Sequence, residues 1–259
     1  MGLLDIRAGV EVDRISSFIK KVVRNASANG VVVGLSGGVD SAVVGALCVK
    51  ALGKGKVLAL LMPSNHTPKQ DLDDATRLAE SWGVRTEKVP ISGIADTLTD
   101  SVKIDGTKIA RANVEARVRM TVLYYHANTL GYLVAGTGDR SENLLGYFTK
   151  AGDGGVDFLP IAHLYKTQVR ELGAHLGLPK GVVEKPASPQ LWPGQKASDE
   201  IPADYDRLDL ALHYLFDLKA TPAEAASKAS VPAAVVEKVL DMHRKTAHKR
   251  AMPPSLVSV

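Results

Sequence analysis

Apolar residues occur along this chain in two patterns, as short continuous runs and as longer stretches with the spacing of an amphipathic helix. The short runs are rich in Val, Leu and Ala, which is typical of strands buried inside a parallel sheet. We expect strands at 31–35, 56–62 and 132–135, and a weaker one at 84–89. We expect helices at 10–28, 42–49, 71–82 and 108–130. This alternation predicts an α/β fold, a doubly wound parallel sheet with right-handed crossovers and flanking helices.

Glycines mark the ends of several predicted helices. Residues 28–30 (Ala-Asn-Gly), residues 53–55 and Gly83 directly follow helical stretches, and glycine is common there because it adopts a left-handed backbone without strain. From Leu164 onward the sequence shows helical stretches and loops. We therefore expect a helical carboxyl-terminal part that packs beside the sheet, within one domain over residues 1–259.

The composition is that of a globular protein, because 45% of the 259 residues are apolar and the mean hydropathy is +0.00. No apolar stretch reaches the roughly 18 to 20 residues of a membrane span, and residues 1–7 lack the apolar core of a signal peptide. The only cysteine, Cys48, lies in an apolar helix and cannot form an internal disulfide, which suits the cytoplasm. The 32 basic and 28 acidic side chains leave too small an excess to indicate nucleic-acid binding.

The strongest chemical signal is the sequence Ser-Gly-Gly-Val-Asp-Ser at residues 36–41, between the first predicted strand and the helix after it. At such a turn, free backbone N–H groups and the positive end of the helix dipole form a seat for phosphate. The two glycines let the backbone approach an anion, and the two serines add hydroxyl donors. Asp40 would repel a phosphate unless a divalent cation lay between them, so Asp40 is a candidate Mg²⁺ ligand.

The same six residues match, letter for letter, the SGGxDS signature of the ATP pyrophosphatases, also called PP-loop enzymes. They lack the Lys-Ser/Thr ending of a Walker loop. The resemblance implies a loop that holds the β- and γ-phosphates of ATP as a pyrophosphate leaving group, with the α-phosphorus open to attack by a substrate oxygen. Taken alone, the segment also fits a glycine-rich turn with a purely structural role.

Three further segments carry residues suited to chemistry. Residues 136–142 form a second glycine-rich turn before a helix, where Glu142 is either the second carboxylate of a Mg²⁺ site or part of a capping box with a surface acid. Residues 146–161 contain four glycines, which fits a binding loop or a long surface turn. Lys166 opens a helix, where a cation opposes the dipole, so we expect a bound anion there unless the side chain extends into solvent.

Together these segments resemble one family, the short, ammonia-dependent NAD synthetases, over nearly the whole chain. The motifs that carry the resemblance lie at 36–41, 113–120, 136–142, 146–160, 166–167, 191–195 and 248–250. The resemblance implies an adenine nucleotide alpha hydrolase-like fold. It also implies a ligase that joins ammonia to the nicotinate carboxylate of deamido-NAD, with ATP and Mg²⁺, through an adenylated carboxylate. AMP, pyrophosphate and NAD would be the products of this last step of NAD biosynthesis.

The resemblance further implies a role for each matching residue. ATP would be bound by Gly34, Leu35, Ser36, Gly37, Gly38, Val39, Asp40, Ser41, Thr137, Lys166 and Ser188. Deamido-NAD would be bound by Arg117, Lys150, Asp157, His248 and Lys249, and Mg²⁺ by Asp40 and Glu142. Asp153 would orient or deprotonate the incoming ammonium, and it would form the catalytic set with Asp40, Lys166 and Ser188.

An adenylated carboxylate is easily hydrolysed, so the site needs a cover, and the Pro- and Gly-rich segment 186–202 is the predicted lid. A glutamine-dependent enzyme would need a second, glutaminase domain with its own catalytic cysteine. We expect neither this domain nor its cysteine from the sequence, so free ammonia is the predicted nitrogen donor unless another subunit supplies the ammonia. The family also implies a homodimer, to which the first helix and the helix at 108–130 would contribute apolar surface.

Two functions from other classes are open at this point. A tRNA-modifying PP-loop enzyme would share the SGGxDS sequence, although thiolating members often carry cysteines or a basic domain that this sequence lacks. A non-catalytic module that binds adenine nucleotides is the second. Such a module would not need Asp40, Glu142 and the acidic loop at 146–161 together.

Overall fold

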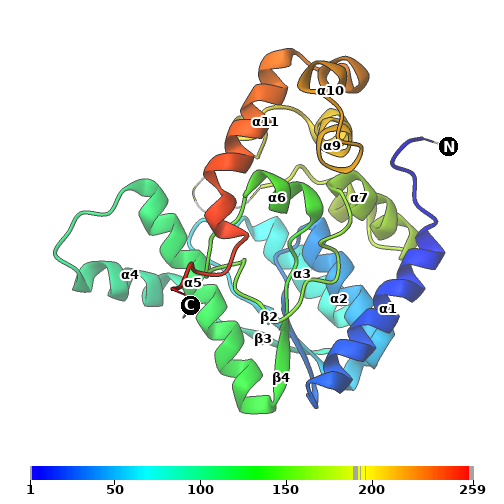
Figure 1. Cartoon of the computed structure of the whole chain (residues 1–259). Coiled ribbons are helices and arrows are strands. Elements are labelled where there is room, and N and C mark those ends of the chain that lie inside the picture. Colours follow the sequence, from blue (N-terminus) through cyan, green and yellow to red (C-terminus); the bar gives the residue numbers. More distant parts are fainter. Residues whose placement is uncertain (1, 189–191, 193, 196, 257–259) are drawn as a thin grey trace.

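The structure, a computed structural model, describes residues 2–188, 192, 194–195 and 197–256 (Figure 1). The strands among these residues form one parallel sheet in the order β3-β2-β1-β4. Their bounds are β1 Gly30–Gly34, β2 Val57–Leu61, β3 Arg85–Lys88 and β4 Tyr132–Ala135. The chain adds β2 and β3 on one side of β1 and then β4 on the other, so the predicted doubly wound sheet is confirmed.

The register of the sheet brings two loops together. Val33 of β1 pairs with Ala135 of β4, so these two strands end next to each other. The strand order reverses at this point, which is where an open α/β sheet leaves a crevice for ligands. The glycine-rich turns that follow β1 and β4 therefore lie side by side.

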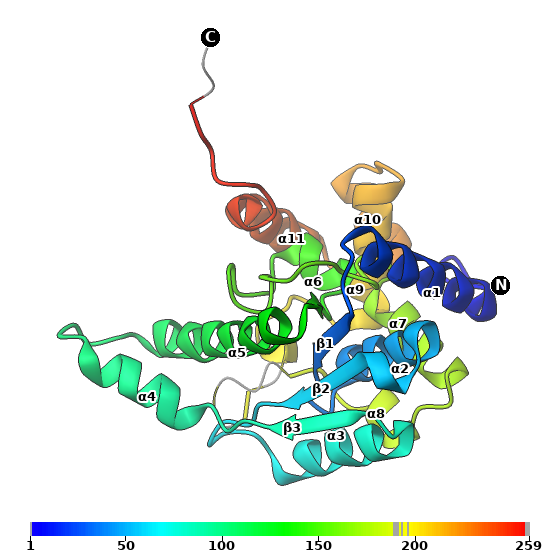
Figure 2. The ribbon, with the colours of Figure 1, turned by 90° about the horizontal axis from the view of Figure 1, so that it is seen from below.

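Helices cover both faces of the sheet (Figure 2). The helices that share one apolar cluster with β1 and β2 are α1 Ala8–Asn25, α2 Val39–Leu52, α3 Lys69–Trp82, α7 Lys166–His175 and α8 Lys180–Val183. On the other face α5, Lys108–Leu130, packs over Val32 and Val134, and α4, Ser92–Ser101, packs against α5. Among the described residues, no helix combines the length and the apolar character needed to cross a membrane.

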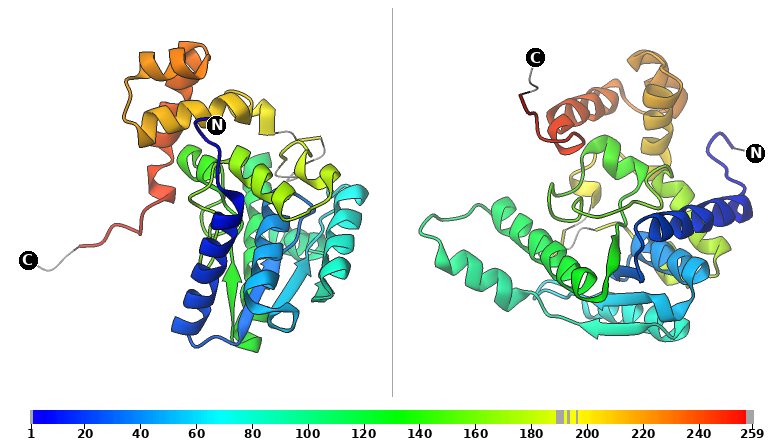
Figure 3. Two further views of the ribbon diagram at one scale, coloured as in Figure 1. Left: turned by 90° about the vertical axis from the view of Figure 1, so that its right-hand side faces the viewer. Right: turned by 60° about the horizontal axis from the view of Figure 1, so that its bottom comes forward.

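The predicted helical carboxyl-terminal part is confirmed. Its helices, with the short α6 before them, are α6 Arg140–Leu145, α9 Tyr205–Leu212, α10 Pro222–Ala229 and α11 Ala233–Lys245. Single turns of other helix types are η1 Lys54–Lys56, η2 Ala197–Asp199, the π-helical η3 His213–Asp217 and η4 Ala247–Lys249. Leu145, Leu208 and Leu212 belong to the separate apolar cluster of this part. Figure 3 shows these helices beyond the end of the sheet to which the strands point.

The end of the first helix differs from its prediction. Helix α1 ends at Asn25, and Gly30 belongs to β1, so the prediction that residues 28–30 cap this helix is wrong. The left-handed residue after the helix is Ser27, with φ of 52°. A Cβ on Gly30 would lie 2.4 Å from the carbonyl oxygen of Lys56. Glycine is therefore needed at this position because the neighbouring backbone approaches closely.

Several other boundaries match or shift by a few residues. The bounds of α5 and β4 agree with the sequence, and Gly53 and Gly83 end α2 and α3 with φ of 82° and 61°. Helix α2 begins at Val39 and not at 42, so half of the SGGxDS sequence lies on its first turn. Helix α4 was not predicted. Cys48 is fully buried, as expected, and burial raises the pKa of its thiol to about 12.

Candidate active site

A cavity of about 470 Å³ opens where β1 and β4 end, between the sheet and the carboxyl-terminal part. Its lining includes most of the residues that the sequence proposes for the site. These are Gly34, Leu35, Ser36, Gly38, Val39, Asp40, Thr137, Glu142, Asp153, Lys166, Ser188 and Lys249. The two glycine-rich turns and the loop at 146–161 thus border one space.

The turn at 36–41 is held by its own side chains. The backbone N–H of Ser36 donates to Ser41 Oγ at 3.2 Å, and this hydroxyl donates to the carbonyl oxygen of Gly38 at 3.0 Å. Gly37 has φ of 80°, in the left-handed region, and a Cβ there would lie 2.2 Å from the carbonyl oxygen of Asp71. Only glycine fits this position. Gly37 and Ser41 are buried in this turn, and they do not line the cavity.

The turn after β4 contains a complete capping box. Asp139 Oδ1 accepts the backbone N–H of Glu142 at 2.8 Å, and Glu142 Oε2 accepts that of Asp139 at 3.4 Å. The capping-box interpretation of Glu142 is therefore correct in its geometry. The acid is not a surface acid, however, because its other oxygen, Oε1, accepts a hydrogen bond from Lys166 Nζ at 2.9 Å.

Lys166 is the centre of the charged cluster. Its side chain is 1% exposed, and its Nζ lies 2.7 Å from Asp40 Oδ2, 2.9 Å from Asp139 Oδ2 and 2.9 Å from Glu142 Oε1. The expected anion beside Lys166 is thus supplied here by three carboxylates, and the side chain does not extend into solvent. Burial alone would lower the pKa of Lys166, but the three negative charges outweigh it and raise this pKa well above its ordinary value.

Burial acts on the two acids Glu142 and Asp139 in the opposite direction to its action on Lys166, because it raises the pKa of a carboxyl group and lowers that of an ammonium. Burial raises the pKa of Glu142 to about 8, the charges of Asp139 and Asp40 add to this rise, and the charge of Lys166 opposes it. Burial likewise raises the pKa of Asp139. The ammonium of Lys166 therefore does not fully offset the burial of these two carboxyl groups.

A buried carboxylate from α9 fixes the helix starts that carry these groups. Asp209 accepts a hydrogen bond from Ser141 Oγ at 2.6 Å and another from the backbone N–H of Thr167 at 2.8 Å. Ser141 Oγ in turn accepts the backbone N–H of Lys166 at 3.0 Å. Burial raises the pKa of Asp209 to about 6, and its hydrogen bonds oppose the rise. The starts of α6 and α7 are therefore oriented together by a residue distant in the sequence.

A second lysine, Lys185, ties the turn at 36–41 to α3. Its Nζ donates to the carbonyl oxygen of Gly37 at 3.0 Å, to Asp71 Oδ1 at 2.5 Å and to Asp74 Oδ2 at 2.6 Å. Sequence reasoning missed this residue because only the folded chain brings residues so far apart together. Asp139 was also missed as a site residue, although the spacing of Asp139 and Glu142 is the signal of a capping box.

The loop at 146–161 closes the other side of the cavity. Lys249 Nζ donates to the carbonyl oxygens of Gly146 and Phe148 at 2.7 and 2.6 Å. Asp153 Oδ1 accepts the backbone N–H of Thr149 at 2.8 Å, and Thr149 Oγ1 donates to Asn113 Oδ1 at 2.8 Å. Because the loop is fixed in this way and lines the cavity, its geometry favours a binding loop over a surface turn.

Four residues proposed for deamido-NAD do not line this cavity. Asp157 Oδ2 accepts the backbone N–H of Val134 at 2.7 Å, and its Oδ1 accepts the hydroxyl of Tyr124 at 3.1 Å. Arg117 donates to the carbonyl oxygen of Lys150 at 3.4 Å, and Lys150 Nζ donates to that of His248 at 2.7 Å. These three residues form a connected set at the edge of the loop.

The predicted lid at 186–202 is described in part. Residues 189–191, 193 and 196 lie outside the described residues. Ser188 and Trp192 line the cavity, and Ser188 Oγ donates to the carbonyl oxygen of Gln195 at 2.6 Å. The ring of Trp192 also lies under the ammonium of Lys108, 4.1 Å from the ring centroid. The described part of the segment therefore borders the cavity, and its closure stays a prediction.

The chain shares its sequence pattern with a known protein family. Residues 11–253 match the family model described as NAD synthase. The chain belongs to this family. It is 50% identical over 254 residues to the NH3-dependent NAD⁺ synthetase of Hyperthermus butylicus, and the match covers 98% of this chain and 92% of that protein.

Solved structures of related proteins have the same fold as this chain. A structure of NMN synthetase from Francisella tularensis has a TM-score of 0.87 at 32% identity, covering 97% of this chain and 99% of that one. The NH3-dependent NAD synthetase from Campylobacter jejuni, in complex with nitrate, has a TM-score of 0.84 at 30% identity, covering 98% and 100%. The chain is thus an ATP-dependent ligase of the PP-loop fold. Membership decides against a tRNA-modifying enzyme and against a non-catalytic module.

Proposed function

We propose that this chain joins ammonia to the nicotinate carboxylate of deamido-NAD, with ATP as co-substrate, and releases NAD, AMP and pyrophosphate. One observation carries the proposal: two phosphate-type turns meet at one cavity, with Asp40, Glu142 and Lys166 beside them. The names of the relatives from Hyperthermus butylicus and Campylobacter jejuni support the same reaction. The cytoplasm, where ATP is abundant and a single free thiol is stable, is the proposed location.

The end of the cavity at β1 is the proposed seat of ATP. The turn at 36–41 opens α2, so backbone N–H groups and the positive helix end would face an anion bound there. Thr137 follows β4, lines the cavity and carries a hydroxyl donor, and Ser188, whose hydroxyl donates to Gln195 in this structure, borders the same cavity. Lys166 supplies the positive charge that a developing pyrophosphate needs in a site shielded from water.

The carboxylates of Asp40 and Glu142 fit a Mg²⁺ ion. This ion prefers oxygen ligands and is commonly held by one or two carboxylates together with substrate phosphates. Asp40 Oδ1 is buried and has no hydrogen-bond partner among the described residues. The pair already accommodates the ammonium of Lys166 between its two side chains. We assign Mg²⁺ to Asp40 and Glu142, where it would neutralise phosphate charge.

Two bond exchanges make up the proposed reaction. A carboxylate oxygen of deamido-NAD bonds to the α-phosphorus of ATP while the bond from this phosphorus to the pyrophosphate oxygen breaks. The nitrogen of ammonia then bonds to the activated carbonyl carbon, gives up a proton, and AMP leaves. Asp153 lines the cavity on the side of the loop at 146–161, and its carboxylate is the proposed acceptor of this proton.

The rest of deamido-NAD is proposed to extend along the loop at 146–161. Lys249 faces the cavity from η4 and Asp153 from the loop. Arg117, Lys150 and His248 form the connected set at the loop edge, which suits contacts with a distant part of a dinucleotide. Asp157, whose two oxygens bind within the protein, acts in this proposal by fixing the loop on β4.

Product formation tests the proposed function directly. Purified protein is incubated with ATP, Mg²⁺, deamido-NAD and either ammonium chloride or glutamine, and AMP, pyrophosphate and NAD are quantified. Equal amounts of the three products with ammonium are expected. Faster turnover with glutamine alone would contradict ammonia as the donor. Nicotinic acid mononucleotide replaces deamido-NAD in a parallel reaction, because one structural relative is an NMN synthetase, and a higher kcat/KM for it would reassign the carboxylate substrate.

Substitution of the assigned metal ligands gives a second prediction. Asp40→Asn and Glu142→Gln keep the size of the side chain and remove its charge, so each is expected to lower NAD formation by about 10²- to 10³-fold and to raise the Mg²⁺ concentration needed for half-maximal rate. Asp73→Asn, on the exposed face of α3, is the matched control and should behave like wild type. Unchanged Mg²⁺ dependence in both site variants would remove the metal assignment.

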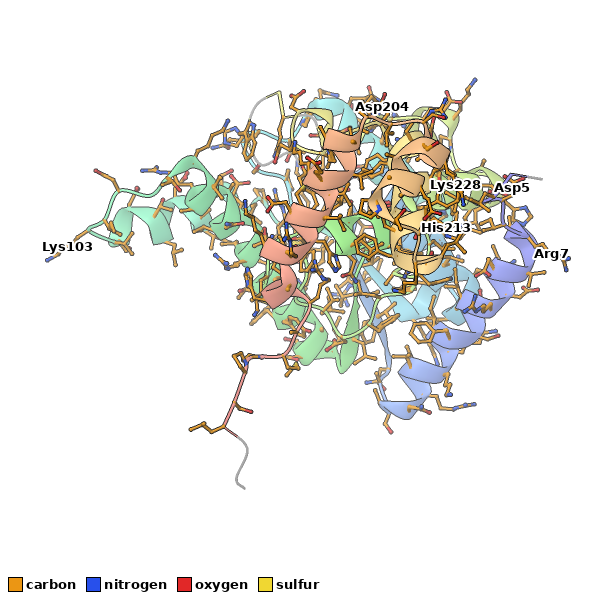
Figure 4. The ribbon with its side chains drawn as sticks, turned by 45° about the horizontal axis from the view of Figure 1, so that its top comes forward. Asp5, Arg7, Lys103, Asp204, His213 and Lys228 are labelled. Atoms are coloured by element: carbon orange, nitrogen blue, oxygen red, sulfur yellow. The ribbon has the colours of Figure 1, made fainter. Side chains whose placement is uncertain are left out.

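A homodimer is proposed from the surface formed by α4 and α5. A second cavity of about 1100 Å³ lies between these helices, and its wall is mainly apolar. Ile94, Leu98 and Tyr125 at this cavity are 48%, 52% and 71% exposed. Figure 4 shows Lys103 at the tip of the α4–α5 connection, which projects away from the body of the protein. Such an exposed apolar surface suits contact with a second copy.

The oligomeric state provides the corresponding prediction. Wild-type protein should sediment as a dimer at micromolar concentration, and Leu98→Glu should shift it toward monomer, because a charge would be buried in the contact without a partner. Leu218→Glu is the control, since Leu218 is 53% exposed and lies at the end of η3. A wild-type mass of one chain, or equal effects of the two variants, would contradict the proposed surface.

A further inference from the structure

Asp139 holds an unusual place in the charged cluster. Its side chain is fully buried and, unlike Asp40 and Glu142, it does not line the cavity. Its Oδ1 accepts the N–H of Glu142, while its Oδ2 lies 2.9 Å from Lys166 Nζ. Among the described residues this Oδ2 has no hydrogen-bond partner, so the ion pair with Lys166 is its one described polar contact.

The three carboxylates around Lys166 therefore divide into two kinds. Asp40 and Glu142 face the cavity and are the proposed ligands of a cation that arrives with ATP. Asp139 is shielded from the cavity and can serve only Lys166 and the start of α6. Once the other two carboxylates engage the cation, Asp139 is the counterion left to hold the ammonium of Lys166.

We propose that Asp139 is a positioning residue of the reaction. It keeps the ammonium of Lys166 at the end of the cavity proposed to hold the phosphates of ATP, while Asp40 and Glu142 bind the metal. This inference rests on the proposed function. Asp139 touches no substrate and acts through Lys166. The capping box gives the arrangement its rigidity, because the carboxylate that pairs with Lys166 also starts the helix that carries Glu142.

Asp139→Asn separates the two roles of the carboxylate. The amide oxygen can still accept the N–H of Glu142, but the other atom becomes a donor that faces the ammonium. The variant replaces the attraction between a carboxylate and the ammonium by a contact between two donors, so we expect kcat for NAD formation to fall by roughly 10- to 100-fold. Asp139→Ser, which retains a good helix cap without a charge, should show the same loss.

A double-mutant cycle with Lys166→Met tests whether Asp139 acts through Lys166. Asp139→Asn should reduce kcat in the wild-type background and cause no further loss in the Lys166→Met background. The melting temperature gives a second measure of the coupling, because Asp139→Asn should be more favourable when the lysine is absent and the buried carboxylate has no counterion. A merely structural cap would give equal shifts in both backgrounds.

Binding of ATP with Mg²⁺ in the absence of deamido-NAD, measured by calorimetry, separates this inference from the proposed function. If the wild-type protein forms no NAD, the proposed function fails, but the cycle can still be completed with ATP affinity as the readout. A wild-type kcat and ATP affinity in both Asp139 variants, or losses that multiply across the cycle, would overturn the positioning role. A loss of kcat confined to the background that contains Lys166 supports it.

Discussion

Lys166→Met is expected to reduce NAD formation by at least about 10²- to 10³-fold, because it removes the positive charge from the proposed phosphate end of the cavity. It should also destabilise the protein at neutral pH. Asp40, Asp139 and Glu142 would share a largely buried site without a counterion, and removal of one partner of a buried ion pair typically costs roughly 3–5 kcal/mol.

The pH dependence of this destabilisation has a defined sign. Burial already raises the pKa of Glu142 to about 8, so the folded protein binds this proton more tightly than the unfolded chain does. Stability from such a group is lost as pH rises from its ordinary pKa toward its folded one. Loss of the ammonium raises the pKa further, so the stability difference between Lys166→Met and wild type should grow as pH rises through about 8, where Glu142 ionises in the folded wild type but not in the folded variant. Urea unfolding at several pH values measures it, and a difference independent of pH would contradict the counterion role.

Gly37→Ala is the second substitution with a large expected effect. The left-handed backbone of Gly37 costs alanine about 1–2 kcal/mol, and the added Cβ would lie 2.2 Å from the carbonyl oxygen of Asp71. The turn at 36–41 or the start of α3 must therefore move. A displacement of about 1 Å commonly costs about 10²-fold in rate, so we expect a loss of this size in NAD formation together with weaker ATP binding.

Gly53→Ala is the matched control for this experiment. Gly53 has nearly the same backbone angle, with φ of 82°, but a Cβ there would meet no atom within 4 Å, and the residue ends α2 away from the cavity. It should lower the melting temperature through backbone strain alone and leave the kinetics unchanged. Similar stability and similar kinetics in the two variants would show that the contact with Asp71 has no importance.

Much of the fold could be predicted because local patterns determine it. The apolar runs at 57–61 and 132–135 and the long helical stretch at 108–130 have no strong local alternative. The end of α1 could not be predicted in the same way. Gly30 has the same local signature whether it caps a helix or permits close approach of a strand, and only the position of Lys56 decides between the two.

The parts of the site that consist of consecutive residues could be predicted from the sequence. The turns at 36–41 and 136–142 follow two adjacent strands, so the pairing of these strands places Asp40 and Glu142 near each other. Lys185 and Asp209 carry no such signal, because their partners lie more than 40 residues away in the chain. The direction of the Lys166 side chain could not be predicted from the sequence either. The helix dipole predicts an anion near this lysine, but it does not indicate that three carboxylates of the protein itself take that place.

The hydrogen bonds of Asp209 have a consequence for how this architecture can change during evolution. A shortened protein that stopped near residue 200 would retain every residue proposed to touch ATP, yet it would lack the acceptor that orients Ser141 and the first amide after Lys166. The part of the chain that carries the proposed ATP site is thus not expected to work apart from the carboxyl-terminal helices. Recombination that exchanged the carboxyl-terminal helices for unrelated ones would preserve the SGGxDS sequence. It would still remove the hydrogen bonds that orient the start of the helix that carries Lys166.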